Sequence, residues 1–373
     1  MTVKQNRIQL VSFIFHEAFL PPITHLEQIF AGISNNAKIL YCILAGVDKK
    51  DELPGVIIIH KHSKRIIARI LRYVLLQARL CTAILRGKDH TDRYLFFMES
   101  GTLFAILAAK LTGKKVFWML PSSLEKKLAL HNDPVSLLLV PLGKASFALC
   151  DKIILYSPNL VNEWQLEPYR HKILIAHEHF LDFNTFPITT PFSGRSPLIG
   201  YIGRLSEEKG VQNFVQALSS SLKDRQDLRL FIGGVGPLRE SIEASLQEQG
   251  LTARVDLPGW ISHDDLPRYL NQLRLLVLPS YTEGLPNIML EAMACGTPVL
   301  ATPVGAIPDV IIDGKTGFIM ENNSPECIAE NVIRALNSPD LDRIAEAGRR
   351  FVEENFTFEK TVEDWKGVLQ SIE

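Results

Sequence analysis

The sequence predicts an α/β protein built from two doubly wound domains. Short apolar segments rich in β-branched residues alternate with longer helical patterns, and the alternation runs twice, on either side of an aperiodic stretch. The expected strands lie at residues 8–15, 39–45, 56–60, 94–98, 115–120, 152–156 and 172–176, and then at 197–203, 228–232, 254–257, 274–278 and 299–302. Continuous apolar strands that alternate with helices are typical of parallel sheets covered on both faces. Two such sets indicate two domains that face each other across a cleft.

The chain of 373 residues is long enough for two separate cores. We expect a first domain at residues 1–185, a linker at 186–196 and a second domain at 197–350. The linker lies in a stretch rich in proline, threonine and serine. Residues 351–373 form a helical pattern with aromatic residues, which we expect to cross back to the first domain.

Composition excludes several classes of protein. A formal charge of −1 gives no overall attraction to nucleic acid. The five cysteines are far apart and show no ligand spacing for zinc, so we interpret them as reduced thiols in a cytoplasmic protein. The apolar run at residues 8–15 is interrupted by Gln9 and Ser12, unlike a secretory signal, and no segment approaches the roughly 20 apolar residues of a membrane span.

The first polar motif, GRLSEEKG, starts at Gly203 and follows an expected strand of the second domain. Gly203 allows a ligand to approach the backbone closely, and Arg204 and Lys209 place two cations at the carboxyl end of the strand. Such cations suit a diphosphate leaving group, on which negative charge builds as a bond breaks. Alternatively, the two cations pair with Glu207 and Glu208 in a solvated turn.

A glycine-rich turn follows the next strand. Gly233, Gly234 and Gly236 lie between that strand and a helix expected to start near Leu238. Bare amides at the positive end of a helix dipole favour phosphate. Many glycines at such turns, however, only make the corner.

The longest motif, at residues 279–296, combines a loop with a helix. Pro286 suits the first turn of the helix and Gly296 its carboxyl end. Glu283 then precedes the helix and Glu291 lies roughly 7 Å along its axis, so the two carboxylates can bond different hydroxyls of one ligand. The alternative makes Glu283 an N-terminal cap and Glu291 an exposed helix charge.

Taken together, residues 197–320 resemble glycosyltransferase family 4 and its relatives with the GT-B fold of two Rossmann-like domains. The matching text is GRLSEEKG at 203–210, GGVGP at 233–237, LPGW at 257–260, PSYTEGLPNIMLEAMACGTPVLATPVGAIPDVI at 279–311 and DGKTGFI at 313–319.

The resemblance implies retaining, metal-independent transfer of a sugar from a nucleotide-diphosphate donor, with no cofactor. It implies that Arg204 and Lys209 hold the diphosphate, Glu283 bonds the sugar hydroxyls and Glu291 bonds the ribose. The remaining donor contacts that we expect are Gly203, Gly234, Gly236, Trp260, Gly284, Leu285 and Asn287. Trp260 would line the base, and UDP-, GDP- and ADP-sugars remain open.

The first domain departs from the family pattern. Relatives often carry a glycine pair after the first strand, whereas residues 16–25 contain no glycine. Relatives also often have a histidine where this chain has residues 117–123, and the next histidine is His131. The acceptor and any catalytic base are therefore not assigned.

Other candidate groups have plain structural explanations. Four histidines could line a cleft, but each is more often a structural residue than a catalyst; they are His16, His25, His177 and His179. Asp340 and Asp342 have the spacing of a metal motif, but they stand at the start of an expected helix, where acidic residues stabilise the first turn. We therefore expect no essential metal.

A basic segment at residues 61–88 contains eight Lys or Arg and no acidic residue. Arg65, Arg72, Arg79 and Arg86 recur every seven residues, so they share one face of a helix whose other faces are apolar. The simpler interpretation is a domain helix with a solvated basic face. The alternative is peripheral contact with an anionic membrane, which would bring a lipid-linked acceptor to the protein.

Three functions follow from these observations. We favour a glycosyltransferase that acts on a glycan, lipid-linked or small-molecule acceptor in cell-envelope or polysaccharide biosynthesis. A non-catalytic nucleotide-sugar-binding protein and another GT-B chemistry, such as a nucleotide-sugar epimerase, are the alternatives.

Overall fold

The structure is a computed structural model with two compact units. It describes residues 7–14, 20–33, 38–44, 56–60, 66–88, 91–97, 103–121, 136–221, 225 and 227–371. Unit 1 comprises Met1–His179 and Glu359–Glu373, and unit 2 comprises Phe180–Phe358. The chain therefore passes between the units after His179, ahead of the linker expected at 186–196, and again after Phe358.

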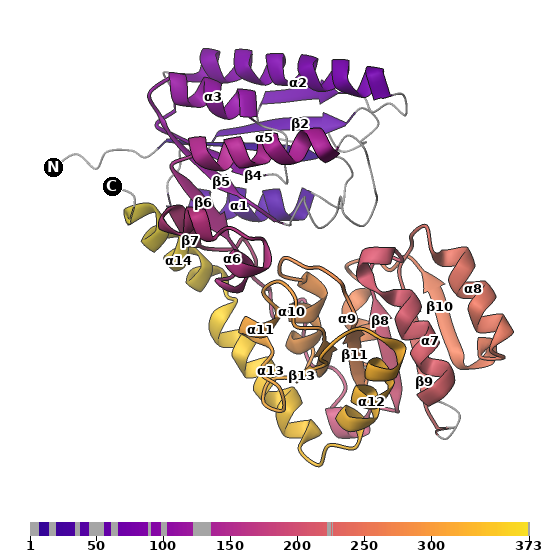
Figure 1. Cartoon of the computed structure of the whole chain (residues 1–373). Coiled ribbons are helices and arrows are strands. Elements are labelled where there is room, and N and C mark those ends of the chain that lie inside the picture. The colour runs from indigo at the N-terminus through magenta and orange to yellow at the C-terminus, as the bar shows by residue number, and fades with distance from the viewer. Residues whose placement is uncertain are drawn as a thin grey trace. The chain divides into compact units, whose positions relative to one another are not determined.

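Unit 1 contains a parallel sheet with the strand order β3-β2-β1-β4-β5-β6-β7. Its strands are β1 (Ile8–Ile14), β2 (Lys38–Leu44), β3 (Val56–His60), β4 (Arg93–Phe97), β5 (Lys115–Met119), β6 (Lys152–Leu155) and β7 (Ile173–Ile175). Its helices are α1 (Leu20–Ile33), α2 (Ile66–Gly87), α3 (Leu103–Leu111), α5 (Ser136–Leu149), α6 (Asn159–Glu163) and α14 (Phe358–Gln370). Helices lie on both faces of this sheet (Figure 1).

Unit 2 contains a second parallel sheet with the order β10-β9-β8-β11-β12-β13. Its strands are β8 (Leu198–Ile202), β9 (Arg229–Gly233), β10 (Val255–Gly259), β11 (Leu275–Leu278), β12 (Val299–Ala301) and β13 (Phe318–Ile319). Its helices are α7 (Val211–Ser221), α8 (Arg239–Glu248), α9 (Leu266–Leu270), α10 (Asn287–Ala294), α11 (Ile307–Val310), α12 (Pro325–Leu336) and α13 (Leu341–Asn355).

The central strands are buried because helices cover them on both sides. Every residue of β4, β8, β11 and β12 is buried. Such strands read as continuous apolar runs instead of alternating ones, which is the pattern that predicted them. The expected α/β class and the parallel sheets are confirmed.

Two elements differ from the expectation. The strand β13 was not predicted, because two residues are too few to give a periodic signal. The helical pattern at the C-terminus is divided into α13 and α14 by a break at Phe356. Trp365 of α14 is buried in unit 1, where its ring meets the edge of Phe30 at 5.1 Å and its Nε1 donates to the carbonyl of His177 at 2.9 Å.

Within the described parts of the chain, no helix has both the length and the apolar character needed to cross a bilayer.

Candidate functional site

The candidate site occupies the carboxyl ends of the parallel strands of unit 2. The loops after β8, β9, β11 and β12 begin at Gly203, Gly234, Pro279 and Thr302, respectively. Parallel strands end at the same edge of a sheet, so these loops share one rim. All of the motifs that pointed to a donor site belong to this rim or to the helix that follows it.

The glycines of the first two loops are required by close backbone approach. The amide of Leu205 donates to the carbonyl of Val235 at 3.0 Å. A Cβ on Gly234, whose φ is +131°, would lie 1.9 Å from the carbonyl oxygen of Gly203, and one on Gly236 would lie 2.2 Å from that of Leu205. The crossing of the loops therefore accounts for these glycines without any ligand, as the corner alternative predicts.

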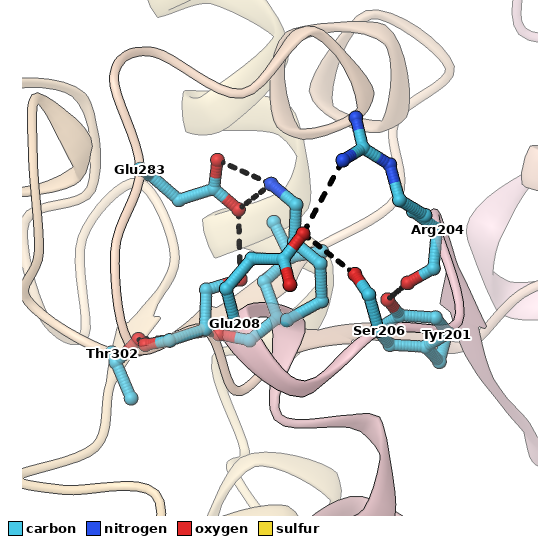
Figure 2. A network of polar contacts seen from close by, with 9 residues as sticks. Tyr201, Arg204, Ser206, Glu208, Glu283 and Thr302 are labelled. Atoms are coloured by element: carbon cyan, nitrogen blue, oxygen red, sulfur yellow. Dashed lines mark hydrogen bonds and ion pairs between the residues drawn. The ribbon is translucent and has the colours of Figure 1, made fainter. Parts of the chain in front are cut away.

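Lys209 and Glu283 form an ion pair that joins two loops. Lys209 Nζ lies 2.7 Å from Oε1 and 2.8 Å from Oε2 of Glu283. Ser280 Oγ donates to the same carboxylate at 2.7 Å, and Glu283 is buried (Figure 2). The alternative in which Glu283 caps a helix is wrong: the cap residue of α10 is Pro286, and that helix end receives no side-chain cap bond.

Arg204 is held loosely beside Glu208. Arg204 Nη1 lies 3.4 Å from Glu208 Oε1, and the Arg204 side chain is 55% exposed. Tyr201 Oη donates to the carbonyl of Arg204 at 2.6 Å, which anchors its backbone and leaves the guanidinium at the surface (Figure 2). The alternative that paired both cations with Glu207 and Glu208 thus holds for Arg204 alone.

Glu208 is a structural carboxylate, which the sequence offered only as a partner for the two cations. Burial raises the pKa of Glu208, but the Ser206 hydroxyl, which donates at 2.7 Å, and the cations Arg204 and Lys209 together bring the pKa below its usual value. The carbonyl of Glu208 also accepts from the amide of Tyr281 at 2.9 Å. The side-chain partners lie on the same turn, and only the bond from Tyr281 comes from a separate loop that local spacing cannot reveal.

The helix α10 starts one residue later than expected. Pro286 has extended backbone angles (φ −75°, ψ 118°) and caps the helix, so Asn287 is its first residue. Gly296 follows its end with φ +67°, as predicted for a helix terminus. The amides of the first turn have no acceptor inside the helix. Gly284, Leu285 and Asn287 therefore lie at a positive helix end.

Gly305 fixes the loop that carries Glu283. Gly305 has φ +64°, and a Cβ there would lie 2.4 Å from the carbonyl oxygen of Glu283 and 2.5 Å from that of Gly284. The next amide, that of Ala306, donates to the Gly284 carbonyl at 2.7 Å. The loop before α10 is therefore positioned by the turn after β12.

Glu291 faces a histidine that was not predicted. Glu291 is buried on α10, so the alternative of an exposed helix charge is wrong. His263 Nε2 lies 3.5 Å from Glu291 Oε1, and hydrogen bonding to Glu291 raises the pKa of His263. The ring of His263 stands edge-on to Phe186 at 5.3 Å. A lone histidine in a loop gives no sequence signal for such a pairing.

Trp260, the aromatic residue of the predicted set, is 71% exposed. It follows Gly259, whose carbonyl accepts from the amide of Gly234 at 2.7 Å. The turn after β10 therefore lies beside the glycine-rich loop, with Trp260 at the surface.

Three of the candidate histidines of unit 1, His25, His177 and His179, lie in the described part of the chain. His16 and His131 lie outside the described residues, and His25 is half-buried on α1. His177 is half-buried, and desolvation of its ring lowers its pKa to about 4. His179 is buried beside Tyr156, with ring centroids 5.1 Å apart.

A buried carboxyl separates these two histidines. Burial raises the pKa of Glu178 to about 7, although the hydroxyl of Tyr156 donates to it at 2.7 Å.

The acidic pair expected at the start of a helix is found there. Asp340 is the N-cap residue of α13, and Asp342 lies in the first turn of this helix.

Comparisons with known proteins point to one class. Residues 182–351 match the family model described as glycosyl transferases group 1. An α-D-kanosaminyltransferase of Streptomyces kanamyceticus is 34% identical over 151 residues, which is 40% of this chain and 39% of that protein. A capsular polysaccharide biosynthesis glycosyltransferase of Staphylococcus aureus, CapM, is 30% identical over 43% of this chain and 42% of its own.

The structural comparison extends over both units. HepE of Anabaena, solved in complex with UDP, has a TM-score of 0.77 at 15% identity and covers 98% of this chain and 100% of its own. This likeness confirms the GT-B fold. The chain spans less than half of the length of the first curated relatives, which are matched over 39–47% of their own lengths.

Proposed function

We propose that the protein is a retaining glycosyltransferase that transfers a sugar from a nucleotide-diphosphate donor without an essential metal or cofactor. The observation that carries the proposal is the meeting of Lys209, Glu283 and the amino end of α10 at one rim. Support comes from the match of residues 182–351 to the group 1 glycosyl transferases.

The rim offers groups for each part of such a donor. Arg204, with its exposed guanidinium, and Lys209 would neutralise the diphosphate as its charge grows. When a phosphate oxygen replaces Glu283 as the partner of Lys209, the Glu283 carboxylate can accept hydrogen bonds from sugar hydroxyls. The amides at the start of α10 would face the phosphate.

Glu291 would bond the ribose and Trp260 would lie near the base. A UDP-sugar is our first choice among the three candidate donors, because the GT-B neighbour HepE was solved with UDP. The acceptor would be a glycan, a lipid-linked sugar or a small molecule, and the relatives named as a kanosaminyltransferase and as a capsular polysaccharide biosynthesis glycosyltransferase support this range.

Glu283→Ala should abolish sugar transfer while nucleotide binding persists, because one sugar contact is lost and the diphosphate cations remain. Donors are first found by ligand-observed NMR with UDP-, GDP- and ADP-sugars. Products are then analysed with and without acceptor. Glu248→Ala, at an exposed carboxylate of α8, serves as the control and should keep full turnover.

Each alternative gives a different result. Binding with no turnover of any donor would identify a nucleotide-sugar-binding protein. A changed sugar formed without an acceptor would identify an epimerase. Unchanged turnover in Glu283→Ala would remove Glu283 from the site.

A further inference from the structure

The outer face of α2 and α3 carries an apolar surface that the fold leaves uncovered. The buried side chains of α2 are Leu76, Gln77, Leu80 and Ile84. The exposed apolar side chains, hereafter the α2–α3 face, are Ile67, Ile70, Leu71, Val74, Leu75 and Leu85 of α2 and Phe104, Leu107 and Leu111 of α3. Ile67 and Leu111 are each 76% exposed and Leu71 is 60% exposed.

This arrangement contradicts the simpler interpretation of residues 61–88 as a domain helix with a solvated basic face. A domain helix with a solvated basic face should bury its apolar side chains, yet most of those on α2 face outward. The two helices pack against each other and form adjacent parts of one layer of unit 1 (Figure 1). Single exposed apolar residues are ordinary on protein surfaces, whereas a contiguous group on two neighbouring helices indicates an interaction site.

Arginines border the apolar residues on one side. Leu75 lies three residues after Arg72 and four before Arg79, so these side chains are neighbours on the helix surface. Arg86 continues the same line seven residues on. Neither α2 nor α3 contains an aspartate or glutamate. Of the basic residues in this segment, Lys61, Lys64 and Arg65 lie outside the described part of the chain.

We propose that the α2–α3 face docks on the surface of an anionic lipid bilayer. Anionic headgroups complement the arginines, and the apolar side chains enter the boundary of the acyl chains, as in amphipathic helices that lie in the membrane plane. A second copy of the chain fits less well, because a symmetric interface would bring arginines together with no acidic residue on either helix to pair with them.

The test is co-sedimentation of the full chain with vesicles of phosphatidylcholine alone or mixed with phosphatidylglycerol. We expect binding to the mixed vesicles only, weakened by high salt. Arg72→Glu with Arg79→Glu should reduce the partition coefficient about tenfold or more. Arg343→Glu with Arg350→Glu, on α13 of unit 2, changes the net charge equally and should bind as the unchanged protein does.

A second variant tests the apolar part. Leu71→Ser with Leu75→Ser should also release the protein from mixed vesicles while its melting temperature stays the same, because both side chains are exposed. Equal weak binding to both kinds of vesicle would overturn the proposal. So would an equal loss in the α13 variant, or a dimer in sedimentation velocity that the Leu71 and Leu75 changes dissociate without any effect on vesicles.

Discussion

At the residue scale, the candidate site depends on carboxylates that are each held by specific donors. Glu283 is fixed by Lys209 and Ser280, and Glu208 by Ser206. A buried carboxylate without such donors would take up a proton or destabilise the fold. The hydrogen bonds therefore hold both carboxylates in position only while the loops remain in place.

Glu208→Gln should lower the free energy of unfolding by about 1–2 kcal/mol at neutral pH, because a charge-assisted bond from Ser206 is weakened. The folded state lowers the pKa of Glu208 below its ordinary 4.5. The stabilisation is therefore present above pH 4.5 and is lost as the pH falls through the lowered value. Urea unfolding at several pH values measures the difference in the free energy of unfolding between the variant and the unchanged protein. This difference should become smaller in acid.

Glu207→Gln provides the control for this prediction, because Glu207 is the exposed neighbour on the same turn. It should change stability little at any pH. The assigned role of Glu208 would be contradicted if the loss of unfolding free energy in Glu208→Gln became larger in acid, or if Glu207→Gln lost as much.

At the element scale, the site is assembled by turns whose backbone contacts leave no room for side chains. The turn after β12 presses Gly305 against the carbonyls of Glu283 and Gly284. A side chain at position 305 would push the Glu283 loop away from Lys209, even though Gly305 has no side chain that could contact a ligand.

Gly305→Ala should therefore weaken donor binding and lower stability by more than about 1 kcal/mol, because it combines a left-handed backbone with a backbone clash. Gly314→Ala is the matched control: Gly314 has φ +68° but meets no atom within 4 Å of an added Cβ. It shares the cost of the backbone angle and lacks the clash. Calorimetric titration with the nucleotide, together with thermal melts, separates the two; equal losses of affinity would show that the close approach is unimportant.

The strands were predictable from sequence because burial on both faces makes them continuous apolar runs. The pairing of Lys209 with Glu283 was not, because it joins residues 74 positions apart and depends on how two loops fold at one rim. For α2 the sequence left open whether the apolar side chains are buried or exposed, for another reason. Apolar residues surround much of this helix, so periodicity alone does not tell which of them the sheet covers.

At the scale of the whole molecule, the two units have separate cores. Unit 1 is completed by the last stretch of the chain, where Thr361 Oγ1 donates to the carbonyl of His179 at 3.1 Å and Trp365 packs on Phe30. Unit 2 is continuous in sequence and has its own core around Tyr201 and Phe214. A protein of this kind need not unfold in a single cooperative step.

Trp365→Ala should destabilise unit 1 by about 3–5 kcal/mol, because it removes a large side chain that is only 1% exposed. Hydrogen exchange read by mass spectrometry should then show faster exchange in β1, β4 and β5, while β8 and β11 keep their protection. Phe214→Ala, in the core of unit 2, should give the opposite pattern. If either change lowered protection equally in both sheets, the units would unfold together, and the C-terminal helix would stabilise the molecule as a whole instead of the unit on which it packs.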